Sequence, residues 1–99
     1  MREIDISVPE GAGSDAIEAA VEHTCKSLGL TLAMRSSLSK YPGCVHWHMK
    51  RKGEKGTLEI TAWPDRRPLW IKIHAGRAAR WIDEIIPGFA SDVQRRLEE

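Results

Sequence analysis

The first pattern in the chain is a strict alternation of apolar and polar residues, in the segment REIDISV at residues 2–8. Its isoleucines and valine occupy every second position, which is the period of a β-strand with one buried face. After residue 30, the turn-forming stretches KYPG, KGEKG and PDRRP separate four similar segments: TLAMRSSL, CVHWHMKR, GTLEITAW and PLWIKIHA. This arrangement predicts a four-stranded antiparallel meander.

Two other stretches show apolar residues at helical spacing. The first predicts a helix over residues 15–28, preceded by Ser14 as an N-cap and stopped by Gly29. The second pattern runs through residues 78–97, at the end of the chain. Because Pro87 lies in its middle, this second helix is expected to be kinked or split there.

The predicted elements follow the order β-α-β-β-β-β-α in one domain, residues 1–99. We therefore expect an α+β fold, with a five-stranded antiparallel sheet, the first strand beside the last, and two helices on one face. The order of elements resembles that of the TATA-binding-protein-like and helix-grip folds. In the first group the open sheet face can lie on nucleic acid, and in the second a ligand cavity can open between the sheet and a long helix. The resemblance rests on element order and on no sequence motif.

Parity along each strand assigns its side chains to one of the two sheet faces. If tight turns are centred on residues 54–55 and 65–67, Lys50 lies opposite Glu59 and Glu59 lies opposite Lys72, so that opposite charges face one another. The same register predicts four further neighbours: His48 with Thr61, Thr61 with Trp70, His46 with Trp63, and Arg35 with His48. All of these side chains are expected on the face without helices.

Three potential metal ligands, Cys44, His46 and His48, share this strand face. A zinc or iron site needs a third ligand, yet the predicted register brings no carboxylate near the histidines and places the cationic Arg35 beside His48. We therefore predict no metal and no cofactor, and interpret the histidines as part of a half-exposed strand face. A nucleophilic Cys44 with His46 as its base is less favoured still, since no orienting third group is apparent.

Charge is distributed unevenly along the chain, although the net charge is only +1. Residues 31–80 contain eleven Lys and Arg against three Asp and Glu, a net +8, whereas residues 1–30 carry −4 and residues 81–99 carry −3. The meander is therefore expected to present positive potential to an anionic partner.

Two tryptophans, Trp63 and Trp70, fall beside basic residues on the helix-free face, a combination typical of single-stranded nucleic-acid binding. Cross-strand pairing of the same indoles is the structural alternative. The predicted ligand-binding residues are Arg35, His46, His48, Lys50, Trp63, Trp70 and Lys72.

These patterns favour a non-enzymatic binding module for an anionic ligand, with nucleic acid as the first candidate. The alternative is a homodimer that buries the same face, and a ligand carrier or metal-dependent enzyme using His46 and His48 is less favoured. The two cysteines are expected on opposite sides of the sheet, without a disulfide. With no apolar run near the roughly 18 residues of a membrane span, a soluble cytoplasmic protein without a membrane partner is expected.

Overall fold

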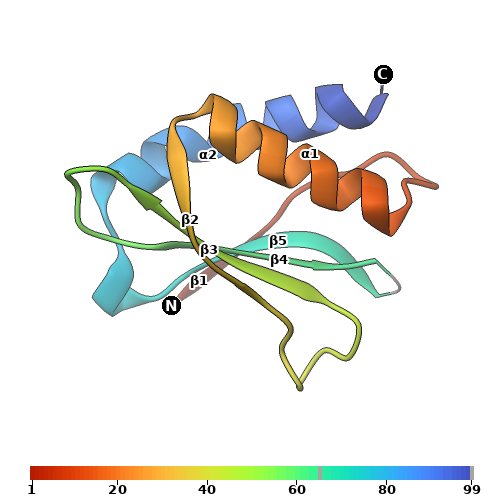
Figure 1. Ribbon diagram of the computed structural model, residues 1–99, viewed down its shortest axis with the longest axis horizontal. Helices are drawn as coiled ribbons and strands as arrows, with labels where there is room; N and C mark the ends of the chain where they lie inside the picture. Colours follow the sequence, from red (N-terminus) through yellow and green to blue (C-terminus); the bar gives the residue numbers. More distant parts are fainter. Residues whose placement is uncertain (65, 99) are drawn as a thin grey trace.

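The chain folds into five strands and two helices, with residues 1–64 and 66–98 described by the computed structural model (Figure 1). The elements are β1 (Arg2–Asp5), α1 (Ser14–Ser27), β2 (Leu30–Ser36), β3 (Val45–Arg51), β4 (Leu58–Trp63), β5 (Arg67–Ile73), the short 3-10 helix η1 (Ala75–Arg77) and α2 (Arg80–Glu98). The strands form one antiparallel sheet in the order β1-β5-β4-β3-β2. The predicted α+β class is confirmed, and so is the place of the first strand beside the last.

Both helices cover the same face of the sheet (Figure 1), and the core lies between these two layers. Every second residue of the central strands points toward the helices and packs against apolar residues of α1 and α2. The fully enclosed members of the core include Ile17, Val21, Trp47, Leu58, Ile60, Ile71, Ile82, Phe89 and Val93. The opposite face of the sheet carries the complementary set of residues and no helix.

The helix ends differ in part from the predicted ones. Helix α1 begins at Ser14 itself, with Gly13 as the N-cap and no side-chain capping bond, so the predicted capping role of Ser14 is wrong. Gly29 stops this helix as predicted, with a φ of +75° that favours glycine. Helix α2 is not divided at Pro87, which lies at an exposed position inside it. No helix among the described residues is long and apolar enough to cross a membrane.

The pairing of β4 with β5 follows the predicted register. Glu59 lies opposite Lys72, and Thr61 lies opposite Trp70. The predicted turn at residues 64–68 includes Asp65, which lies outside the described residues.

The pairing of β3 with β4 is displaced by two residues from the prediction. His48, and not Lys50, lies opposite Glu59, and His46 lies opposite Thr61. Because the displacement is an even number of residues, every side chain keeps its predicted face. The neighbours of each side chain on that face are nevertheless different.

The displacement originates in the loop between β3 and β4. The Glu54 amide donates a hydrogen bond to the Arg51 carbonyl (3.0 Å), which closes a turn directly after β3. The loop then packs against the segment that leads into α2. At Gly56, which has a φ of +101°, a Cβ would lie 2.7 Å from the Ala79 Cβ and 3.0 Å from the Arg77 carbonyl oxygen. The start of β4 therefore coincides with a local turn after β3 and with a close contact to a distant segment.

Strand β2 contains an irregularity between Leu32 and Met34 that reverses the alternation of its second half. Met34 lies opposite His48, the place predicted for Arg35. Arg35 instead points to the helix side, where its guanidinium pairs with Glu18 of α1. The predicted contact between Arg35 and His48 is therefore wrong. The charge of Arg35 would not repel a metal ion at the histidines, because its guanidinium lies on the other side of the sheet.

Candidate metal centre

The tryptophans predicted to be exposed on the helix-free face are covered by the loop between β2 and β3. Trp70 is only 2% exposed, because the Tyr41 ring packs on it edge-to-face with ring centroids 5.3 Å apart, and the Arg67 guanidinium lies 4.4 Å from its ring centre. Trp63 is half-buried against Tyr41 and donates its indole N–H to the Pro42 carbonyl (2.9 Å). The prediction of two exposed indoles is therefore wrong for Trp70.

The seven predicted ligand-binding residues do not form one exposed surface. Arg35 lies on the helix side, and His46 is 4% exposed, whereas Lys50 is exposed and Lys72 is half-buried. The KYPG stretch predicts only a turn, and nothing in the sequence indicates that its tyrosine folds back over the sheet. Binding of nucleic acid and formation of a homodimer stay predictions.

Both cysteines are free and buried. Cys44 directly precedes β3, and its Sγ accepts a hydrogen bond from the Leu38 amide (3.3 Å). Burial, assisted by Glu22, raises the pKa of the Cys25 thiol to about 12. Cys44 is not a member of the cluster of potential metal ligands found among the described residues.

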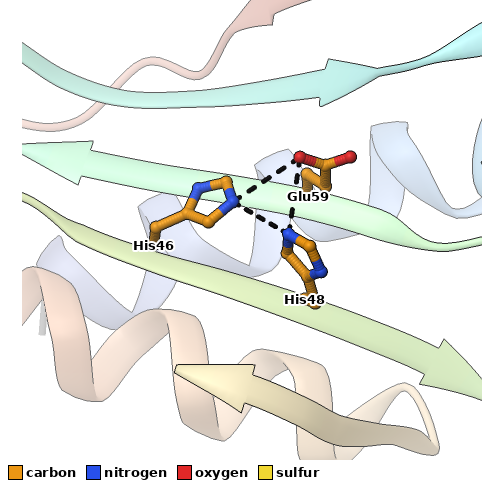
Figure 2. A group of neighbouring side chains, drawn as sticks. All are labelled: His46, His48 and Glu59. Carbon is orange, nitrogen blue, oxygen red and sulfur yellow. Dashed lines mark hydrogen bonds and ion pairs between the residues drawn. The ribbon is translucent and has the colours of Figure 1, made fainter. Parts of the chain in front are cut away.

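That cluster consists of His46 and His48 on β3 and Glu59 on β4. The Nε2 atoms of the two histidines are 3.0 Å apart, and each lies 3.5 Å from Glu59 Oε1. Figure 2 shows the three side chains pointing toward one another from neighbouring strands. Like His46, Glu59 is only 4% exposed. The β3–β4 register thus supplies the carboxylate that the sequence-based register lacked.

A second set of groups orients these three side chains. Glu59 Oε2 accepts a hydrogen bond from Arg77 Nη1 (3.1 Å) and lies 3.4 Å from His74 Nε2. His46 Nδ1 is 2.8 Å from the Thr61 hydroxyl. When Nδ1–H is donated to this hydroxyl, His46 Nε2 presents its lone pair to the cluster.

Electrostatics favour neutral imidazoles in the cluster. Burial is the main cause that lowers the pKa of His46, and the neighbouring His48 lowers it further. Burial also lowers the pKa of His48, with Arg77 and His74 acting in the same direction. Glu59 opposes the shift at both residues. Neutral imidazole is the form in which histidine binds a metal.

The spacing of the three ligand atoms fits a tetrahedral metal ion. Bonds of about 2.0–2.1 Å place neighbouring ligands of such an ion about 3.3 Å apart. The observed separations of 3.0, 3.5 and 3.5 Å bracket this value. The alternative is a self-contained hydrogen-bonded cluster, and no buried side-chain nitrogen or oxygen among the described residues lacks a partner.

Sequence reasoning missed Glu59, His74 and Arg77 as members of this site, and it placed Thr61 opposite His48 instead of His46. One signal was present: Glu59 is a carboxylate in the otherwise uncharged strand LEITAW, with the same facial parity as the two histidines. Because the predicted β3–β4 register was displaced by two residues, it placed Glu59 opposite Lys50 and not opposite His48.

Comparisons of the chain with protein-family models, curated proteins and solved structures found no match. The resemblance to TATA-binding-protein-like and helix-grip folds therefore stays a prediction from element order.

Proposed function

We propose that this domain binds a divalent transition-metal ion, with Zn²⁺ as the first candidate, through His46, His48 and Glu59. The observation that carries the proposal is the convergence of two imidazole nitrogens and one carboxylate oxygen at separations of 3.0–3.5 Å. Two histidines and one glutamate are an established donor set for zinc.

The contacts around the cluster support this assignment. Ligating histidines usually donate their second ring N–H to a fixed acceptor, and Thr61 is in place to receive that of His46. Ligating carboxylates are usually hydrogen-bonded as well, and the two oxygens of Glu59 have separate partners. Oε1 faces the histidines, while Oε2 is held by Arg77. The arginine thus orients the carboxylate without occupying the ligand oxygen.

Three protein ligands leave at least one coordination position of the ion open. Structural zinc sites are closed by four protein ligands, whereas sites with three serve ligand binding or catalysis. His48 is half-buried, in contrast to the buried His46, so the open position is expected on the His48 side of the cluster. A facial set of two histidines and one carboxylate also suits Fe²⁺, which makes the choice of metal part of the test.

Calorimetry on chelator-treated protein without a histidine tag tests the proposal. We expect one Zn²⁺ per chain, and a loss of affinity of about 100-fold or more in His48→Ala and in Glu59→Gln. The matched control is His23→Ala, because His23 is exposed on α1. Parallel titrations with Fe²⁺ and Co²⁺ rank the three metal ions by their affinity for the protein.

Thermal unfolding of the metal-free variants shows that each one still folds. Zn²⁺ should raise the unfolding temperature of the wild type and of His23→Ala, but not that of Glu59→Gln. The proposal is wrong if the wild type binds no metal, or if Glu59→Gln and His48→Ala bind it as tightly as His23→Ala does.

A further inference from the structure

The helix-free face next to the candidate metal centre carries two lysines in addition to Arg77. Lys50 follows His48 by two residues on β3 and therefore shares its face. Lys72 lies opposite Glu59 on the neighbouring strand.

Neither lysine has an ion-pair partner within the part of the chain that the structure describes. Strand pairing places two carboxylates opposite Lys72, Glu59 on β4 and Glu3 on β1. Glu3 is already bound by Arg67 at 2.8 Å. Lys50 lies opposite the uncharged Thr31 of β2. Neither ammonium group is thus held in a close ion pair, and both can take part in binding an anion.

A bound metal ion would leave this face strongly positive. Glu59 contributes one negative charge, and Arg77 already balances it through their hydrogen bond. Lys50 and Lys72 add +2, whereas Glu3, Asp5 and Arg67 at the β1 edge of the face together carry −1. The excess is therefore +1, which a divalent ion raises to +3. Charges of one sign on neighbouring positions of a sheet face repel one another, and more strongly near a protein surface than in bulk water. A dianion bound at the open position relieves more of this repulsion than a monoanion does.

We infer that the open position of the metal ion receives a phosphate dianion, as inorganic phosphate or as a phosphate monoester. One phosphate oxygen binds the ion, and the remaining oxygens face Lys72 and Lys50. The inference rests on the proposed metal site. A phosphate monoester carries close to two negative charges at pH 7, whereas a carboxylate and each internal phosphodiester of a nucleic acid carry one. The local charge thus favours the monoester over both.

Calorimetry on zinc-loaded protein, freed of unbound metal by gel filtration, tests the inference with inorganic phosphate as the probe. We expect phosphate to bind the loaded protein at least about tenfold more tightly than the metal-free protein. Lys72→Gln should weaken phosphate binding by about tenfold and leave zinc binding at least as strong. Lys40→Gln is the matched control, because Lys40 lies over the Tyr41 ring in the β2–β3 loop and should bind phosphate as the wild type does.

Three comparisons separate the possible failures. Zinc stoichiometry is measured first, and a protein that binds no zinc overturns both the metal site and this inference. If zinc binds but phosphate affinity is the same with and without it, or falls equally in Lys72→Gln and Lys40→Gln, the phosphate site is wrong and the metal site stands. Acetate, or a short oligonucleotide without terminal phosphate, that binds as tightly as phosphate overturns the preference for a dianion.

Direct coordination has its own readout. Cobalt(II) in place of zinc gives the site a visible absorption that depends on the ligands of the ion. Phosphate should change this spectrum in the wild type and in Lys40→Gln at the concentrations found by calorimetry. An unchanged spectrum at saturating phosphate contradicts coordination of the anion by the metal.

Discussion

Glu59 lies directly opposite His48 in the β3–β4 ladder, at the position that charge pairing predicts for Lys50. With lysine opposite, Glu59 would form an ordinary cross-strand ion pair. With His48 opposite and His46 two residues away, its Oε1 instead lies 3.5 Å from two imidazole nitrogens. This one relationship converts a charged strand face into a cluster with the donor set of a metal site.

Thr61→Val tests the orienting contact of His46. Valine keeps the shape of threonine but lacks the hydroxyl that accepts a hydrogen bond from His46 Nδ1. Both residues are buried, so the imidazole N–H would be left without a partner. We expect a loss of about 1–3 kcal/mol in unfolding free energy, measured by urea titration of the metal-free protein. Zn²⁺ affinity should fall by about 10–100-fold. Thr31→Val, an exposed site on β2, should change neither quantity. Unchanged zinc affinity in Thr61→Val would show that the hydroxyl does not orient the imidazole.

Trp70→Ala tests whether the loop between β2 and β3 buries this indole. Because Trp70 is enclosed by Tyr41 and Arg67, its truncation should cost about 3–5 kcal/mol of unfolding free energy. The half-buried Trp63 serves as the comparison, and Trp63→Ala should cost clearly less. Urea unfolding followed by circular dichroism measures both. Equal stability of Trp70→Ala and the wild type would contradict the burial of this side chain.

Asp92 on α2 links the two helices and should make the protein sensitive to acid. Its carboxylate accepts hydrogen bonds from Thr24 on α1 (2.8 Å) and from Arg96 (2.7 Å). Arg96, Thr24 and Arg95 together hold the pKa of Asp92 far below its ordinary value. A lowered pKa in the folded state stabilises the protein above the unfolded-state pKa of about 3.9, and this contribution is lost as the pH falls below that value.

Asp92→Asn should therefore cost about 1 kcal/mol at pH 7, with the value kept small because the carboxylate is partly exposed to solvent. The difference from the wild type should shrink when the pH is lowered from about 5 to about 2. Urea titrations at several pH values measure it, with Glu84→Gln on the exposed side of α2 as a control for the loss of one negative charge. A difference that is constant with pH would contradict the contribution of the ionised carboxylate.

Local patterns in the sequence were sufficient for the elements and for the two faces of the sheet. Alternation in segments such as REIDISV depends only on the period of a strand, and the apolar spacing of residues 15–28 only on that of a helix. The structure confirms these elements, and the β4–β5 register, which places Glu59 opposite Lys72, follows from the same parity.

The candidate site depended on contacts between segments far apart in the chain. Gly56 packs against Ala79 just before β4, and β4 lies two residues from its predicted register, so that Glu59 rather than Thr61 is opposite His48. The irregularity in β2 turns Arg35 toward α1, and the fold of the next loop brings Tyr41 over Trp70. Parity is a property of a single strand, so the sequence alone predicts it. The β3–β4 register and the coverage of the helix-free face depend also on packing between distant segments, and only the tertiary structure reveals them.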